Sequence, residues 1–170
     1  MNQVLKRWNE APSPEAVREI MACCGAKAWG QKVAGRRPFQ DEASLLAAAN
    51  EVWSGLAPRD WLEAFASHPR IGETAAKAPA SAQSSSWSRQ EQTQVAGSDP
   101  EVQAALASAN RAYERKFGHI FIVCATGKSA AEILAILSRR MQNDEGSELR
   151  EAADEQRQIT QLRLKKWLGL

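Results

Sequence analysis

One histidine of this chain stands where side chains commonly do chemistry. The sequence of 170 residues holds two histidines, and His68 lies in the stretch FASHPRIGE, at the end of an apolar run and directly before Pro69. Because proline disfavours helix at the residue before it, we expect a helix to end here and His68 to lie at a helix–loop boundary. Imidazole titrates near neutral pH, so His68 is a candidate acid or base. A buried, hydrogen-bonded histidine without catalytic function is the alternative.

An arginine occupies a position in the last predicted helix where an apolar residue is expected. On a helical wheel, Arg163 falls in the middle of the apolar face, between Ile159 and Gln156. A guanidinium stays charged, so burying it without an anionic partner is costly. Two interpretations follow. Arg163 either snorkels to the edge of the face or pairs with an internal carboxylate, or it binds an anionic substrate in a bidentate manner.

The stretch SRQEQ, residues 88–92, holds a further group of polar side chains. Ser88 and Glu91 have the spacing of a capping box, which predicts a helix that begins at Ser88 and explains both residues structurally. The motif does not explain Gln92, a second polar side chain at the same helix end.

Motifs of several function classes are missing from the sequence. His68 and His119 are far apart and have no matching ligand spacing, so a metal site is not expected. No GxGxxG, P-loop or GxSxG motif indicates a nucleotide cofactor or a serine hydrolase. The net charge is +2, with no basic stripe among stacking aromatics, which argues against nucleic acid as a partner.

Cysteine usage and hydropathy favour a cytoplasmic location. The three cysteines are Cys23, Cys24 and Cys124, an odd number without a CxxC motif, so reduced thiols are expected rather than a disulfide framework. No apolar run is long enough to span a bilayer, and no membrane partner is expected.

The elements that position these residues are predicted to be helices, because alanine is abundant and apolar residues recur at helical spacing. Residues 74–87 are predicted to form a surface loop, and HIFIVCA, residues 119–125, a buried extended segment. No repeat or domain boundary is visible, so residues 1–170 are predicted to form a single all-α bundle of roughly seven to nine helices. Three predicted helices have both ends marked: one begins at Ser13–Pro14 and ends near Gly25, one covers residues 26–33, and one begins at Asp99–Pro100 and ends at Gly118. Four further helices are predicted to begin at Asp41, Pro58, Ser88 and Ser129, and the last helix is predicted to end near Leu168.

Four stretches of the chain, taken in order, resemble one enzyme family. They are HPRIG at 68–72, SRQEQ at 88–92, NRAYERKFGHIFIVC at 110–124 and QITQLRLKKWL at 158–168. Together they are similar to the 2-oxo-4-hydroxy-4-carboxy-5-ureidoimidazoline (OHCU) decarboxylases of purine catabolism. The resemblance covers essentially the whole chain, including Trp29 and RPF at 37–39.

The resemblance implies an all-helical, cofactor-independent enzyme that decarboxylates OHCU to (S)-allantoin. It implies that His68 is the acid/base group, that Glu91 orients it and that Arg163 anchors the anionic substrate. Family members often form homodimers. The chain departs from the family at His119 and Ile120, where an aromatic residue and a proline are usual, and in the serine-rich segment before Ser88. The further positions that match substrate-holding residues of the family are Pro69, Ser88, Gln92 and the backbone of Phe121, Ile122, Val123 and Cys124.

Two alternatives from other function classes stay open. One is a non-enzymatic helical interaction module, which would not need His68, Glu91 and Arg163 to converge. The other is a hydrolase of a ureido compound, in which His68 and Glu91 activate water.

Overall fold

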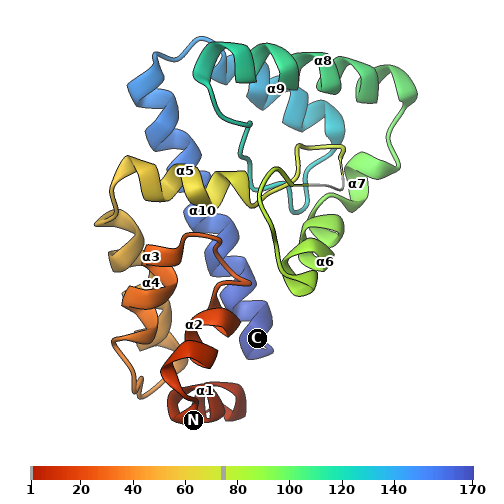
Figure 1. Ribbon diagram of the computed structural model, residues 1–170. Helices are drawn as coiled ribbons and strands as arrows, with labels where there is room; N and C mark the ends of the chain where they lie inside the picture. The colour runs from red at the N-terminus through yellow and green to blue at the C-terminus, as the bar shows by residue number, and fades with distance from the viewer. Residues whose placement is uncertain (1, 74–75) are drawn as a thin grey trace. The chain divides into compact units, whose positions relative to one another are not determined.

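The computed structural model describes residues 2–73 and 76–170, and its regular structure is helical (Figure 1). These residues form ten helices and no strand, which confirms the all-α class, with slightly more helices than the roughly seven to nine expected from periodicity. One isolated β-bridge joins Pro69 and Ala76. The chain divides into two compact units: one runs to Ala64 and resumes over Arg157–Leu170, and the other is Phe65–Gln156. The single domain over residues 1–170 stays a prediction.

The first unit packs its helices around buried tryptophans. Trp8 and Trp29 are fully buried, and their indole N–H groups donate to the carbonyls of Ala16 at 3.0 Å and Ala49 at 3.1 Å. Each ring therefore buries a large apolar area without leaving its polar atom unpaired. The helices are α1 (Gln3–Glu10), α2 (Ser13–Ile20), α3 (Lys27–Ala34), α4 (Glu42–Ser54), most of α5 (Pro58–Ala66) and the second half of α10 (Glu145–Leu168).

Local signals set most of these helix boundaries. Asp41 caps α4 as predicted, by accepting a hydrogen bond from the Ser44 N–H at 2.7 Å. α2 differs from the prediction because Pro12, not Ser13, occupies its N-cap position and the helix ends at Ile20 rather than near Gly25. The backbone tightens there into a turn in which the Cys23 N–H donates to the Ile20 carbonyl at 3.0 Å. α1 lies outside the predicted helices; the side chain of Asn2 caps it.

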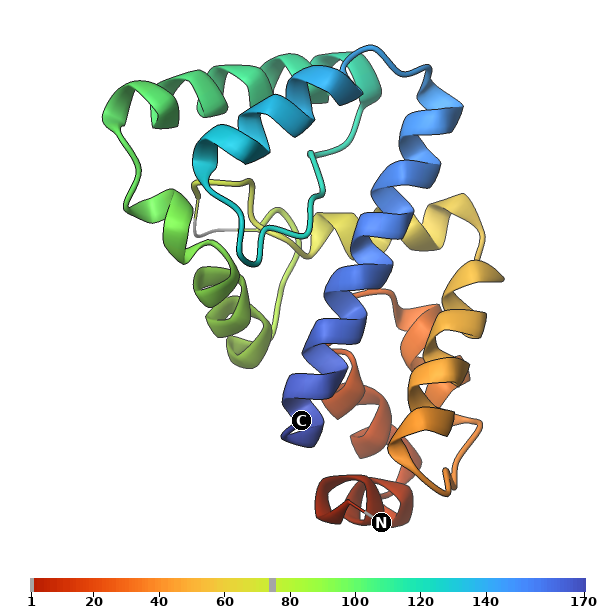
Figure 2. The ribbon, with the colours of Figure 1, turned by 180° about the vertical axis from the view of Figure 1, so that it is seen from behind.

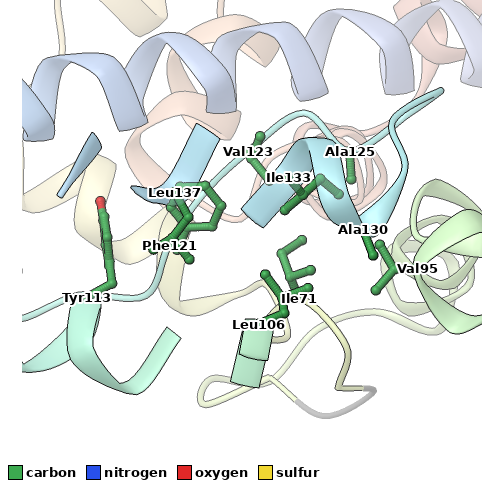
Figure 3. Close-up of a cluster of buried hydrophobic side chains, with 10 residues drawn as sticks. All are labelled: Ile71, Val95, Leu106, Tyr113, Phe121, Val123, Ala125, Ala130, Ile133 and Leu137. Atoms are coloured by element: carbon green, nitrogen blue, oxygen red, sulfur yellow. The ribbon is translucent and has the colours of Figure 1, made fainter. Parts of the chain in front are cut away.

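The second unit is built on α8 (Pro100–Phe117) and α9 (Ala130–Arg140), which lie side by side in both views (Figures 1 and 2). Ile120–Ala125, in the connection between them, is buried and non-helical, as expected for this stretch. Side chains of both helices and of this connection converge on one core (Figure 3). Its buried members are Ile71, Val95, Leu106, Tyr113, Phe121, Val123, Ala125, Ala130, Ile133 and Leu137.

Helix α6 (Ala82–Glu91) corrects two expectations. Residues 82–87 are helical rather than part of a loop, and Ser88 lies inside the helix rather than at its N-cap. The N-cap is Ser81, whose hydroxyl accepts a hydrogen bond from the Ser84 N–H at 3.0 Å. The earlier start buries Trp87 within the helix. Residues 76–81 are non-helical as predicted, and residues 74 and 75 of the predicted loop lie outside the described residues.

Candidate functional site

His68 follows the end of α5, at the boundary that Pro69 predicts. The His68 N–H donates to the Phe65 carbonyl at 3.0 Å, which closes a turn directly after the helix. The side chain is 8% exposed, and its Nε2 lies 2.7 Å from Oε1 of Gln156 in α10. Gln156 is itself fully buried. The imidazole is therefore held inside the second unit by a neutral amide.

The residues after Pro69 are anchored by α8. The Arg70 guanidinium pairs with the Glu114 carboxylate, and this hydrogen bonding lowers the pKa of Glu114 below its ordinary value. The side-chain amide of Asn110 donates to the Ile71 carbonyl at 3.1 Å. These contacts give Arg70 a structural function and fix the chain on the C-terminal side of His68.

The end of α6 carries the second group of predicted site residues. Ser88 is buried in this helix, and Glu91 is its half-buried last residue. Gln92 follows as the C-cap, and its Oε1 accepts a hydrogen bond from the Gly72 N–H at 2.8 Å. Burial raises the pKa of the Cys124 thiol, and the negative charge of Glu91 adds to this effect. Glu91 thus lies within electrostatic reach of the segment that contains Cys124.

The backbone of residues 121–124 already has protein partners. The Ile122 carbonyl accepts a hydrogen bond from Nη1 of Arg140 at 2.6 Å. The Cys124 N–H donates to Oε2 of Glu155 at 2.6 Å, and the Cys124 carbonyl accepts from Nζ of Lys128 at 2.7 Å. A ligand that used the Cys124 amide would have to displace the Glu155 carboxylate.

A buried ion pair that the sequence pattern did not single out supports the same segment. Arg140 and Glu148 are fully buried, and Nε of Arg140 donates to Oε1 of Glu148 at 2.9 Å. The Tyr113 hydroxyl donates to this carboxylate as well, and burial together with that bond raises the pKa of the phenol. The burial of Arg140 could have been inferred from its position, because it follows Leu137 by three residues and so lies on the apolar face of α9.

Arg163 belongs to the first unit, whereas all other predicted site residues belong to the second. It is 2% exposed, so it does not snorkel to the surface. Burial raises the pKa of the Cys23 and Cys24 thiols, that of Cys24 to about 11, and the positive charge of Arg163 partly offsets the rise.

Gln156 is the site residue that sequence reasoning missed. It stands beside Arg163 on the apolar face of α10, where a polar side chain calls for a partner. The partner itself, His68, lies 88 residues away in sequence, and no local pattern connects the two.

A separate pocket of about 610 Å³ lies beside α8 in the second unit. It contains none of the predicted catalytic residues. Its lining includes Arg70, Ile71, Val95, Gln103, Asn110 and Arg111.

Three further features concern the residues that the structure describes. Across 2–73 and 76–170, no group of three or more His, Cys, Asp or Glu side chains is arranged to hold a metal ion. In the same ranges, no helix combines the length and the apolar character needed to cross a bilayer. Cys23, Cys24 and Cys124 are buried and form no disulfide.

Relatives of known function match this chain over most of its length. The model of the OHCU decarboxylase family matches residues 9–165. The chain is 34% identical over 152 residues to the uric acid degradation bifunctional protein TTL of Arabidopsis thaliana, covering 87% of this chain and 46% of that protein. It is 31% identical over 130 residues to the 2-oxo-4-hydroxy-4-carboxy-5-ureidoimidazoline decarboxylase of Amia calva, covering 75% of this chain and 73% of that protein.

The chain spans less of the bifunctional relatives than of the decarboxylases. It covers 46% of the Arabidopsis protein and 31% of the uric acid degradation bifunctional protein of Bacillus sp. (strain TB-90). Of the decarboxylase from Haloferax volcanii, which is 26% identical over 134 residues, it covers 77%.

Solved structures show the same fold. A crystal structure of OHCU decarboxylase in the presence of (S)-allantoin matches with a TM-score of 0.77 and 33% identity, covering 89% of this chain and 98% of that one. A crystal structure of (S)-allantoin synthase matches in fold with a TM-score of 0.69 at 18% identity, covering 96% of this chain and 53% of that one. With the family's model matched from residue 9 to residue 165, the chain belongs to the OHCU decarboxylase family.

Proposed function

We propose that this chain catalyses the cofactor-independent decarboxylation of OHCU to (S)-allantoin in purine catabolism. The observation that carries the proposal is the family match over residues 9–165. A structural neighbour at 33% identity was crystallised in the presence of (S)-allantoin, the product of this reaction. The substrate is therefore a small anionic heterocycle.

The chemistry suits a protein that supplies only binding and proton transfer. OHCU bears a carboxylate and a hydroxyl on one ring carbon, and the neighbouring carbon forms an imine. When the bond to the carboxylate breaks, its electron pair moves toward the imine nitrogen and carbon dioxide leaves. Because the substrate is its own electron sink, no cofactor has to take up these electrons. Protonation of the resulting enol on one face of the ureido-bearing carbon gives a single enantiomer.

In this proposal, His68 exchanges the proton with the hydroxyl or with the new C–H bond. Glu91 orients the imidazole or the ureido nitrogens, and Arg163 binds the carboxylate. Holding the carboxylate out of the ring plane aligns the breaking bond with the imine. Gln92 binds the amide edge of the ring with its donor and its acceptor. Pro69, Ser88 and the backbone of residues 121–124 complete the substrate contacts.

Gln156 and Arg163 are two of the buried polar residues of α10. The helix runs unbroken from Glu145 to Leu168, and Gln156 and Arg163 are seven residues apart. Residues seven apart in an α-helix share one face. Both residues lie on the apolar face of the helix, Gln156 in the second unit and Arg163 in the first.

Substitution of His68 tests the proposal. His68→Asn is expected to lose about 10²- to 10⁴-fold in the rate of chiral allantoin formation, because positioned proton transfer contributes about that much. His119→Asn, the matched control, is expected to keep the rate. Circular dichroism must follow the optical activity, since OHCU also decays spontaneously to racemic allantoin. A His68→Asn protein that forms chiral allantoin at nearly the wild-type rate contradicts the assignment.

The same assay separates the two interpretations of Arg163. As an anion anchor, Arg163→Leu raises KM and leaves the free energy of unfolding largely intact. As the partner of an internal carboxylate, it lowers the free energy of unfolding and leaves KM unchanged. Release of carbon dioxide rather than ammonia distinguishes a decarboxylase from a hydrolase of ureido compounds.

Compartment and assembly stay predictions. Three buried cysteines without a disulfide are compatible with a reducing cytoplasm. The homodimer that family members often form is an expectation for this chain as well.

A further inference from the structure

We infer that Gln156 is a positioning residue for His68: its amide oxygen holds the imidazole as the Nε2–H tautomer and thereby assigns Nδ1 as the atom that exchanges a proton with the substrate. The inference deepens the proposed function and rests on the catalytic role proposed for His68. It specifies which nitrogen of the ring does the chemistry and which residue decides this.

The contact between the two side chains has a defined direction. Nε2 of His68 lies 2.7 Å from Oε1 of Gln156, well within hydrogen-bond distance. An amide oxygen only accepts hydrogen bonds, so the proton of this bond is on Nε2. A neutral ring that is protonated on Nε2 carries its in-plane lone pair on Nδ1. The imidazolium formed when Nδ1 takes up a proton keeps the same bond to Gln156.

Burial of the contact favours one tautomer of His68 over the other. Gln156 is fully buried and His68 is 8% exposed, so water cannot readily replace either partner. Turning the ring to the other tautomer would leave the amide oxygen facing a ring nitrogen without a proton. Breaking a buried hydrogen bond in this way is unfavourable, and the Nε2–H form is therefore expected to dominate.

The second histidine of the chain provides an internal reference. Nδ1 of His119 lies 3.0 Å from the backbone carbonyl oxygen of Ile120, which also only accepts. The proton of His119 is therefore on Nδ1. The two histidines are expected to be opposite tautomers, and a spectrum of the ring nitrogens needs to separate only two rings.

A neutral amide suits this task better than a carboxylate would. It orients the ring by hydrogen bonding without adding the full negative charge that stabilises the imidazolium. The ring therefore remains able to give up its proton as well as to take one. This property matters for a residue that acts as acid or base in the same cycle.

Nitrogen-15 NMR of the labelled full chain tests the tautomer directly, at a pH where both rings are neutral. We expect His68 to show a protonated Nε2 and a bare Nδ1, and His119 to show the reverse pattern. His119→Gln assigns the two sets of signals. A His68 ring that is protonated on Nδ1, or that averages over both tautomers, overturns the inference whatever the activity of the protein.

Substitution of Gln156 tests the link to catalysis. Gln156→Met keeps the length of the side chain but removes the acceptor, so the His68 ring should mix its tautomers while the His119 signals stay in place. We expect kcat for chiral allantoin to fall about 10-fold or more, with KM changed much less. Gln156→Glu restores an acceptor oxygen and should restore the Nε2–H form.

The outcomes separate the inference from the proposed function. If His68→Asn keeps its activity, the catalytic role of His68 fails, and the NMR result still decides the tautomer. If His68→Asn is inactive while Gln156→Met keeps both kcat and the Nε2–H form, only the positioning role fails. If Gln156→Met does not fold, the spectra of the wild type and of Gln156→Glu still decide whether His68 is protonated on Nε2.

Discussion

At the scale of single residues, the buried arginine and glutamate among the described residues of the second unit, Arg140 and Glu148, form one ion pair. Arg140 and Glu148 have no exposed surface, and Tyr113 and Asn143 donate further hydrogen bonds to the same carboxylate. Arg140 in turn binds the Ile122 carbonyl. A pair of this kind is costly to break, because removing one charge leaves the other buried without compensation. The network therefore holds the 121–124 segment to α9 and α10.

Glu148→Gln tests this function of the pair. The substitution keeps the shape and the acceptor oxygen but strands the Arg140 charge, so we expect the free energy of unfolding to fall by about 3–5 kcal/mol. Urea unfolding at pH 7 measures the change. Glu145→Gln, at the exposed start of the same helix, is the control and should stay within about 0.5 kcal/mol of the wild type. Equal unfolding midpoints for the two variants contradict the assigned role of Glu148.

At the scale of elements, helix ends were predictable where the residues at the boundary determine the local backbone conformation by themselves. Ser129 and Glu132 form the predicted capping box at the start of α9. Gly118 ends α8 with φ 76°, a left-handed conformation that glycine adopts at low cost. The end of α5 follows from Pro69 in the same manner. In each case, all the residues that determine where the helix begins or ends lie within a few positions of that end.

Helix α6 was not predictable for the opposite reason. The segment from Ser81 to Ser88 offers several serines, each of which can cap a helix, and local pattern does not rank them. Tertiary packing decides, because a start at Ser81 buries Ser84 and Trp87. Ser88 and Glu91 have capping-box spacing by coincidence, one turn or more into the helix.

Ser81→Ala tests which serine caps α6. Loss of the hydrogen bond to the Ser84 N–H should cost about 1 kcal/mol of unfolding free energy and should speed amide exchange in the first turn of the helix. Ser86→Ala, inside the same helix, serves as the control, because alanine has the higher helix propensity there. Hydrogen exchange read residue by residue measures both effects. Protection of the Ser84 amide that is unchanged by Ser81→Ala excludes Ser81 as the cap.

At the scale of the molecule, two features could not be predicted from the sequence: the division into two compact units and the contact between His68 and Gln156. Domain boundaries usually fall in polar linkers, but the two boundaries here fall inside α5 and α10, so composition does not mark them. The position of His68 after a helix end and the place of Arg163 on the apolar face of its helix could both be derived from local pattern, whereas the burial of Arg163 could not. The pairing of His68 with Gln156 could not, because it depends on how segments far apart in sequence pack.

Carboxyl groups that form ion pairs with arginine predict that the chain loses stability in acid. Hydrogen bonding to Arg70 lowers the pKa of Glu114, and hydrogen bonding to Arg139 lowers that of Glu151. Such carboxyl groups bind protons more weakly in the folded chain than in the unfolded one, whose glutamates titrate near about pH 4.3. Their stabilisation is therefore complete well above that pH and is lost as the pH falls toward the lowered values. Urea unfolding between pH 7 and pH 3.5 should show this decline, and Glu114→Gln should make it shallower because one of the shifted groups no longer titrates. A decline that is equally steep in Glu114→Gln shows that other groups control the acid sensitivity.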